Sequence, residues 1–357
     1  TGALLTRGTK TRGADQIAAV FDRVGGRISG SSGNNTIGMS CEVLKEDFDA
    51  ALDVFADVVV NASFPEAEFK KLQQRRLNAI AAQDDDWGGE LYRRFREEYF
   101  GKHPYRNTTL GQHETVKQLK VGDIRRFYAE RVVPERGVLS VFGDINEEEV
   151  LSELQKVFAD FKRTAPALPE AAAPPDRKKA EKHFPVKREI SAICVGYHGT
   201  RYTNPDRYKL MLLDGVLSPR LYNAMRGERD LVYLVYAGNF TGLDPGYFSV
   251  TAAATPANMP EVTKIIHREI KRLRDEEVPE EELKRAKAMI INSEILGNQT
   301  NANMAVRAVL DELYGLGYAH SKDFQKLVEG ITAKDLLDTA NKYLKDPLTV
   351  QLDGTRK

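Results

Sequence analysis

The chain has 357 residues, which is too long for one ordinary hydrophobic core and predicts two or more domains. Its 52 Lys and Arg residues equal its 52 Asp and Glu residues, so the formal net charge is zero and no basic field exists to hold nucleic acid. No apolar run approaches the roughly 20 residues that span a bilayer. Two cysteines are too few for a disulfide framework, and each is predicted to fill a core position on a strand.

The first half is predicted to hold a strand, several helices and a closing strand. Residues 36–43 alternate well enough for a strand. Spacing of i, i+3 and i+4 then predicts an amphipathic helix with an apolar stripe. That stripe consists of Phe48, Ala51, Leu52, Ala56 and Val59. Pro65 is predicted at the first position of the next helix, followed by glutamates that suit a helix N-terminus. Residues 137–142 are predicted to form the closing strand.

The second half follows a segment rich in Pro and Ala, residues 164–176, which is predicted to be a semi-rigid linker. It opens with a predicted strand at residues 189–196 and a helix near residues 208–217. Later strands are expected at residues 233–240, 247–253 and 348–352.

A repeat relates the two halves. Residues 64–71 match residues 278–285, and the two prolines differ by 214 positions (279 − 65). The repeat predicts an α+β fold with two homologous lobes from an internal duplication, each a mostly antiparallel sheet with helices packed on one face. On this pattern the strand that leads the first lobe should lie upstream of Thr1.

The predicted domains are therefore a first lobe at residues 1–163, which is N-terminally incomplete, a linker at residues 164–184 and a second lobe at residues 185–357.

Three motifs within this duplicated pattern point to a family. Residues 221–233 read Leu-Tyr-Asn-Ala-Met-Arg-Gly-Glu-Arg-Asp-Leu-Val-Tyr, residues 5–9 read Leu-Thr-Arg-Gly-Thr, and residues 103–105 read His-Pro-Tyr. Together they resemble the pitrilysin/insulinase-type zinc metallopeptidase superfamily, especially its mitochondrial-processing-peptidase-like members. The resemblance covers nearly the whole chain. It implies two similar lobes that face each other, and a clam-shell made from two subunits or two fused halves.

The family's zinc motif, His-x-x-Glu-His, does not match this chain. Aligning residues 8–9 with the family's Gly-Thr places Ala3 at the second zinc histidine and Gly2 at the general-base glutamate. The first histidine would lie upstream of residue 1. The distal glutamate ligand falls near Asn78 or Ala79, and neither is a plausible zinc ligand.

Histidine spacing leads to the same conclusion without an alignment. A helical zinc motif needs two histidines four positions apart. No two histidines of this chain are four apart; they are His103, His113, His183, His198, His267 and His320. A catalytic zinc also needs a carboxylate that activates water, and the first glutamate is Glu42. The sequence predicts no catalytic residue and no metal site of the family type.

Arg226 and Tyr233 are the candidate substrate-binding residues. The resemblance implies that an arginine and a tyrosine at this seven-residue spacing hold substrate, and both side chains can donate hydrogen bonds to a peptide carbonyl or an oxyanion. The residues alone also allow Arg226 to be a solvated charge at a helix end and Tyr233 to be a core strand residue with a polar tip. Active relatives usually have glycine where Asp230 stands.

The leading hypothesis is a non-catalytic subunit of a two-subunit zinc metallopeptidase. A homologous partner would supply the zinc motif and the zinc, and this chain would hold the peptide substrate, which would add as an edge strand. The alternatives are a structural or assembly scaffold and a peptide-binding homodimer without proteolysis. Fold alone does not separate these three. The resemblance suggests the bacterial periplasm or envelope as the location.

Overall fold

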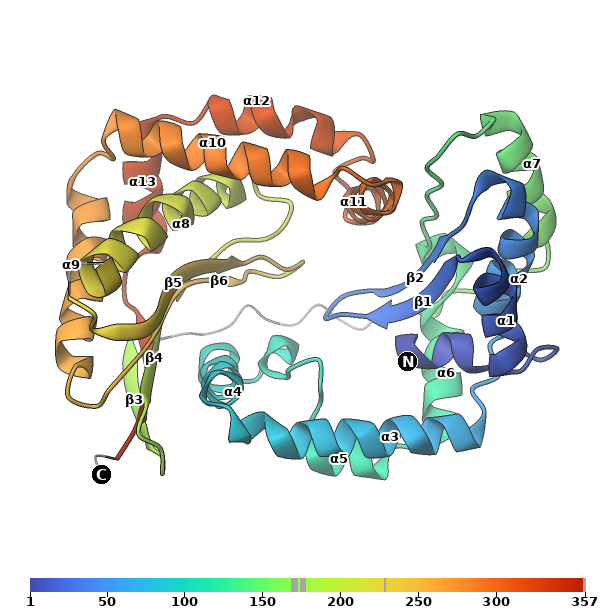
Figure 1. Ribbon diagram of the computed structural model, residues 1–357, viewed down its shortest axis with the longest axis horizontal. Helices are drawn as coiled ribbons and strands as arrows, with labels where there is room; N and C mark the ends of the chain where they lie inside the picture. Colours follow the sequence, from blue (N-terminus) through green and yellow to red (C-terminus); the bar gives the residue numbers. More distant parts are fainter. Residues whose placement is uncertain (168–172, 174–177, 228, 356–357) are drawn as a thin grey trace. The chain divides into compact units, whose positions relative to one another are not determined.

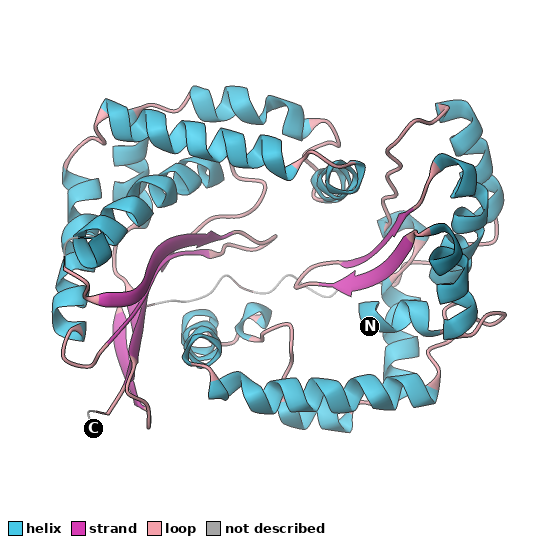
Figure 2. Ribbon diagram, viewed as in Figure 1, coloured by secondary structure: helices cyan, strands magenta, loops and turns pink. Residues whose placement is uncertain are grey.

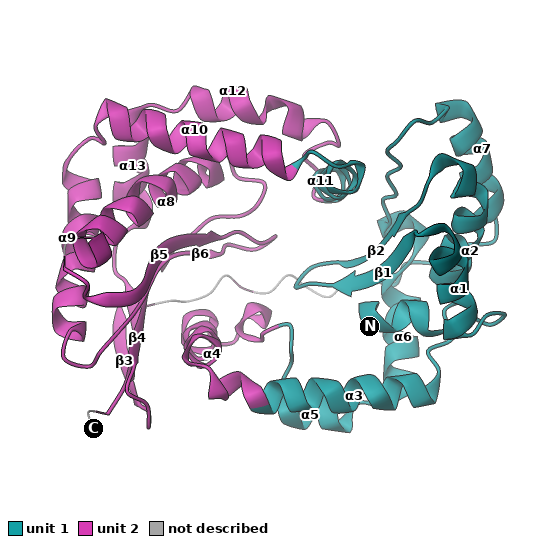
Figure 3. Ribbon diagram, in the orientation of Figure 1, with its two compact units in different colours: residues 1–81, 109–170, 298–313 teal, residues 82–108, 171–297, 314–357 magenta. Residues whose placement is uncertain are grey.

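The computed structural model describes residues 1–167, 173, 178–227 and 229–355. The chain is a mixed α/β protein that divides into two compact units (Figures 1, 2 and 3). The first unit comprises residues 1–81, 109–170 and 298–313, and the second comprises residues 82–108, 171–297 and 314–357.

The first unit is built on a two-stranded antiparallel sheet in which β1 (Arg27–Ser32) pairs with β2 (Ile37–Glu42). Its other main elements are the 3-10 helix η1 (Gly2–Arg7) and the helices α1 (Ala14–Val24), α2 (Phe48–Asn61), α3 (Glu66–Ala81), α5 (His113–Gln118), α6 (Val121–Arg131), α7 (Glu147–Val157) and α11 (Asn301–Leu313). Its core includes Leu4, Phe21, Val58 and Phe64, so η1 and the helices bury their apolar faces together.

The second unit contains a five-stranded sheet with the order β3-β7-β4-β6-β5. The strands are β3 (Ala180–Pro185), β4 (Ser191–His198), β5 (Val232–Phe240), β6 (Tyr247–Ala254) and β7 (Leu348–Asp353). The helices are α4 (Trp87–Phe100), α8 (Asp206–Tyr222), α9 (Met259–Asp275), α10 (Glu280–Gly297), α12 (Phe324–Glu329) and α13 (Ala333–Tyr343). All neighbours are antiparallel except β3 and β7, and β5 lies at one edge.

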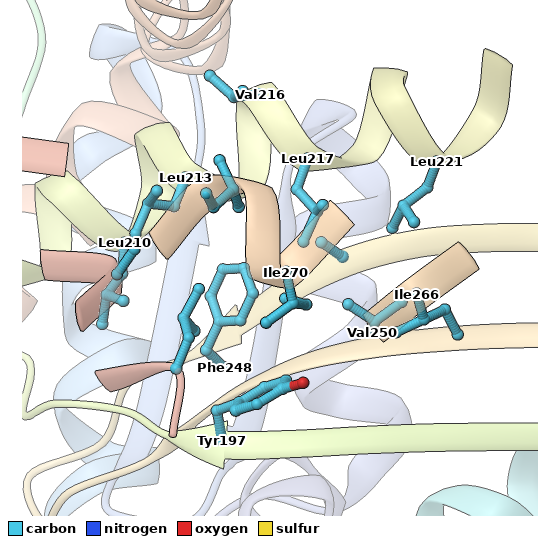
Figure 4. Close-up of a cluster of buried hydrophobic side chains, with 14 of the residues drawn as sticks. Tyr197, Leu210, Leu213, Val216, Leu217, Leu221, Phe248, Val250, Ile266 and Ile270 are labelled. Atoms are coloured by element: carbon cyan, nitrogen blue, oxygen red, sulfur yellow. The ribbon is translucent and has the colours of Figure 1, made fainter. Parts of the chain in front are cut away.

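Both faces of this sheet are covered by helices. On one face Ile193 and Val195 of β4 pack with α8, α9 and α13 in the large core cluster of Figure 4. On the other face Ala192 and Cys194 pack with α4, which belongs to the first half of the sequence. The prediction that helices pack on one face is therefore wrong for this sheet. The small side chains on the second face leave room for the aromatic side chains of α4.

Most predicted strands are confirmed, but one is wrong. Strands β2, β4, β5, β6 and β7 lie within two residues of their predicted positions. Residues 137–142, predicted as the closing strand of the first lobe, form no strand in the described structure. An apolar run alone does not make a strand, since a strand needs a partner to satisfy its backbone groups. Helices α3 and α10 begin one residue after Pro65 and Pro279, not at them.

The linker and the lobe boundaries also differ from the predicted ones. Part of the predicted linker, residues 168–172 and 174–177, lies outside the described residues. The predicted end of the linker at residue 184 is wrong, because β3 begins at Ala180 and pairs in parallel with β7. The compact units also depart from a division at the linker in two segments. Residues 82–108 belong to the second unit, and residues 298–313 belong to the first.

Candidate functional site

Both candidate side chains lie in the part of the chain that leads from the end of α8 to the start of β5. Helix α8 contains Pro219, which has no N–H to donate, and the helix passes into a π-helix at Asn223–Gly227 before β5 begins at Val232. Arg226 lies in the π-helix and Tyr233 lies at the start of β5. Short π-helical turns are frequent at functional sites, because the extra residue changes the direction of nearby side chains.

Arg226 is fixed at the start of β5 and not at the end of α8. Its Nη1 donates a hydrogen bond to the carbonyl oxygen of Val232 at 2.9 Å and lies 2.7 Å from Oδ1 of Asp230. The side chain remains 44% exposed. The alternative in which Arg226 satisfies the terminal helix carbonyls is therefore not what the structure has, and the unbonded part of the guanidinium is accessible.

Tyr233 points into solvent from an edge strand. The register of β5 against β6 shifts between Val232 and Leu234, so Tyr233 is the extra residue of a β-bulge. Tyr233 is 59% exposed, and Leu234 and Tyr236 are also exposed. The alternative that Tyr233 is a core residue is wrong. These three side chains form an apolar stripe along the edge strand. The sequence did not predict this stripe, because the bulge exposes two consecutive residues and so breaks the alternation of a regular strand.

Helix α8 is joined to β5 by a chain of hydrogen bonds. The backbone N–H of Ala237 donates to Oγ of Ser218 at 2.9 Å, and Ser218 donates to Oδ1 of Asp214, also at 2.9 Å. Burial raises the pKa of Asp214 from 3.8 to about 6, although the hydrogen bond from Ser218 acts in the opposite direction. These two hydrogen bonds hold helix α8, which leads to Arg226, against strand β5, which carries Tyr233.

The His-Pro-Tyr motif fixes the other end of β5. The backbone N–H of Tyr105 donates to Nδ1 of His103 at 3.1 Å, so Nε2 carries the proton and donates to Asp244 at 3.2 Å. The N–H of Asp244 in turn donates to the hydroxyl of Tyr105 at 3.3 Å. Asp244 lies in the turn between β5 and β6, so this motif attaches the hairpin to the segment that follows α4.

The positions aligned with the zinc motif do not fit a zinc ion. Gly2 lies in η1 so close to β1 that a Cβ atom at this position would be 2.1 Å from the carbonyl oxygen of Ser31. Gly30 of β1 lies equally close to η1, since a Cβ atom at residue 30 would be 2.3 Å from the carbonyl oxygen of Gly2. A glutamate at position 2 therefore has no space.

The other aligned positions offer no zinc donor of the family type. Ala3 has no donor atom, and Ala79 on α3 has none either. The side-chain oxygen of Asn78 accepts a hydrogen bond from Gln74 at 2.9 Å. Among the described residues, no group of three or more His, Cys, Asp or Glu side chains is placed to hold a metal ion.

The fold and these motifs define a peptidase-type α/β protein that has glycine and alanine at positions 2 and 3, where the resemblance places the general-base glutamate and the second zinc histidine. The family profile described as Insulinase (Peptidase family M16) matches residues 3–113, and the profile described as Peptidase M16 inactive domain matches residues 118–290. The chain belongs to this family, the pitrilysin/insulinase-type zinc metallopeptidase superfamily.

Curated relatives span nearly the whole chain. An "uncharacterized zinc protease" of Rickettsia bellii is 27% identical over 363 residues, which cover 98% of this chain and 85% of the relative. A protein with the same description from Streptomyces coelicolor is 25% identical and covers 96% of this chain and 76% of the relative.

Solved structures share the fold. A peptidase M16 inactive domain from Pseudomonas fluorescens matches with a TM-score of 0.89 at 20% identity, over 100% of this chain and 87% of that one. A protease from Helicobacter pylori matches with a TM-score of 0.88 at 21% identity, over 98% of this chain and 87% of that one. None of the described helices combines the length and the apolar composition needed to cross a bilayer.

Proposed function

We propose that this chain is the non-catalytic subunit of a two-subunit zinc metallopeptidase. The observation that carries the proposal is the contact between Gly2 and β1, which leaves no space for the side chain of a general base where active members have one. Ala3 lacks the imidazole that an active member has at the second ligand position. A homologous partner subunit would supply the zinc and the water-activating glutamate.

The second half of the proposal is that this chain holds the peptide. Tyr233 is exposed on an edge strand, and Arg226 is held against the first residue of the same strand by its hydrogen bond to Val232. An extended peptide pairs with such an edge through its main chain, which suits substrates of varied sequence. The phenol of Tyr233 and the free guanidinium nitrogens of Arg226 then donate to peptide carbonyls.

The proposal includes two homologous lobes that arose by duplication. Helix α4 begins at Trp87 and α11 begins at Asn301, a separation of 214 positions (301 − 87) that equals the separation of the two matched prolines. Each of these helices packs in the compact unit that is formed mainly by the other half of the chain. This reciprocal arrangement supports the duplication.

The test combines this chain with a zinc-bearing homologous subunit. We expect the purified chain alone to bind no stoichiometric zinc and cleave no peptide, and the mixture to cleave peptides in a chelator-sensitive way. Arg226→Ala and Tyr233→Phe should each reduce cleavage by the mixture by about a hundredfold, the lower end of the range for loss of a positioned hydrogen-bond donor. Arg229→Ala, which removes an exposed arginine of the same turn paired with Glu261, is the matched control.

Each contrary result has a defined meaning. Stoichiometric zinc in the homogeneous chain together with chelator-sensitive cleavage would overturn the non-catalytic assignment. Normal turnover by both variants would remove the role of Arg226 and Tyr233. Saturable peptide binding without cleavage in any mixture would favour the peptide-binding homodimer, and a co-purifying partner without a zinc motif would favour the structural scaffold.

A further inference from the structure

Asp230 lies in the turn that connects the π-helix to β5, at the position where the resemblance places a glycine. Asp230 has a φ of 48°, in the left-handed region that glycine adopts readily and that Asp and Asn tolerate better than other residues. The backbone therefore keeps the turn that a glycine would make. The carboxylate is an addition that glycine does not supply.

That carboxylate is directed at the candidate substrate-binding arginine. Oδ1 of Asp230 lies 2.7 Å from Nη1 of Arg226, the same nitrogen that donates to Val232. The Arg226 and Asp230 side chains are 44% and 79% exposed, so water screens the pair and its effect on stability is small. The pair changes instead what the guanidinium presents to a ligand.

We propose that Asp230 determines the charge preference of the peptide site, so that the site accepts neutral extended peptides and rejects acidic ones. The inference rests on the proposed peptide-holding role of Arg226. An arginine without a counter-charge binds carboxylates strongly through its fork of N–H donors. With Asp230 on Nη1, an incoming carboxylate meets a like charge, while a neutral carbonyl still finds the remaining donors.

The surroundings of Arg226 agree with a neutral ligand. The next arginine, Arg229, is already paired with Glu261 at 2.9 Å. Along the strand, Tyr233, Leu234 and Tyr236 present an exposed apolar stripe. A peptide that lies on this stripe contacts apolar surface beside a charge pair that is internally balanced.

The experiment measures peptide binding by the full-length chain at low ionic strength. The probes are a labelled nine-residue peptide of apolar and glutamine residues, and a set of variants in which glutamate replaces each glutamine in turn. Fluorescence anisotropy gives each Kd. We expect the wild-type chain to bind the neutral peptide more tightly than any acidic variant.

Removal of the Asp230 carboxylate should remove this discrimination. Asp230→Asn keeps a side chain that tolerates positive φ, and Asp230→Gly keeps the turn without any side chain. Both should improve binding of at least one glutamate-containing peptide by about threefold to fivefold relative to the neutral peptide, the range for an exposed charge pair. The gain should shrink as salt is added, and it should disappear when Arg226→Ala is combined with either change.

The matched control is Asp338→Asn, which removes the carboxylate of another exposed i,i+4 pair, that with Lys334 on α13, without touching Arg226 or Arg229. It should leave the charge preference unchanged. An unchanged preference in both Asp230 variants would overturn this inference, and so would equal binding of acidic and neutral peptides by the wild-type chain. If Arg226→Ala weakens binding while the Asp230 variants behave as wild type, the proposed function stands without this inference. If neither Arg226→Ala nor Tyr233→Phe alters binding, the proposed peptide-holding role of these two residues itself fails.

Discussion

Arg226 and Tyr233 are related by sequence spacing, but their surroundings are set by different contacts. The seven-residue spacing singled out these two residues, and the resemblance of the surrounding motif to the family favoured a substrate-binding role for them. The tether of Arg226 to Asp230 and Val232 depends on the left-handed turn, which the sequence did not reveal because aspartate adopts that conformation far less often than glycine. The exposure of Tyr233 depends on a β-bulge, which shifts the face of one residue.

Asp214 provides a test at the scale of one residue. Its pKa in the folded chain is raised from 3.8 to about 6, so ionisation costs more in the folded than in the unfolded state. This cost grows as pH rises through that interval and is fully present above about pH 6. Asp214→Asn keeps an oxygen that accepts from Ser218 and removes the charge. Its free energy of unfolding relative to wild type should be about 1–2 kcal/mol higher, meaning greater relative stability, at pH 8 than at pH 5.

Urea unfolding at the two pH values measures this difference, and any cost of burying the new amide cancels in it because that cost is the same at both. Asp338→Asn is the matched control, since Asp338 is 65% exposed on α13 and pairs with Lys334. A relative stability of Asp214→Asn that stays constant between pH 5 and pH 8 would contradict the raised pKa.

Helix α4 is the element whose role differs most from the sequence prediction. It is an amphipathic helix of the first half, and its sequence does not reveal which sheet it covers. In the structure its apolar residues, including Leu91, Phe95 and Tyr99, lie on the second face of the five-stranded sheet. Phe95 fits there because β4 has Gly196, where a Cβ atom would be 2.2 Å from the ring.

Phe95→Ala should destabilise the second unit strongly. The ring is 1% exposed and packs edge-on against Tyr247 at a centroid distance of 4.9 Å, so its removal loses buried area and leaves a cavity. We expect a loss of about 3–5 kcal/mol in the free energy of unfolding, measured by chemical denaturation. Glu98→Ala, on the exposed side of the same helix, should change stability by less than about 0.5 kcal/mol. Equal effects of the two changes would contradict this packing.

Strands, like helix α4, show that local sequence does not reveal which distant segment an element contacts. Residues 37–42 alternate and residues 137–142 are mostly apolar, and both patterns suit a strand, but only β2 has a partner in the described structure. By contrast, β3 has charged and exposed residues that resemble the linker before it, and it is a strand because β7 offers backbone partners. Pairing between distant segments decides which extended segment becomes a strand.

At the scale of the whole molecule, the two compact units do not follow the order of the chain. Residues 82–108 belong to the second unit although the linker separates them from its other parts. A fragment of residues 178–357 therefore lacks α4 and leaves Ala192, Val350 and Leu352 of the sheet uncovered. We expect this fragment alone to aggregate or to unfold without cooperativity, because an apolar sheet face is exposed.

Co-expression with a fragment of residues 1–167 should restore a soluble, cooperatively folding complex, as circular dichroism and size-exclusion chromatography can measure. The intact chain is the reference. A monomeric, cooperatively folding fragment of residues 178–357 would show that the second unit does not need α4.

Sequence alone determined the family, the lack of a general base at position 2 and of a zinc donor at position 3, and the spacing of Arg226 and Tyr233, because each is a property of residue identity along the chain. Tertiary structure decided that Gly2 contacts β1, that α4 covers the second face of the five-stranded sheet, and that Asp230 pairs with Arg226. These features arise from contacts between distant segments and from backbone dihedral angles, and neither is encoded in local pattern or composition.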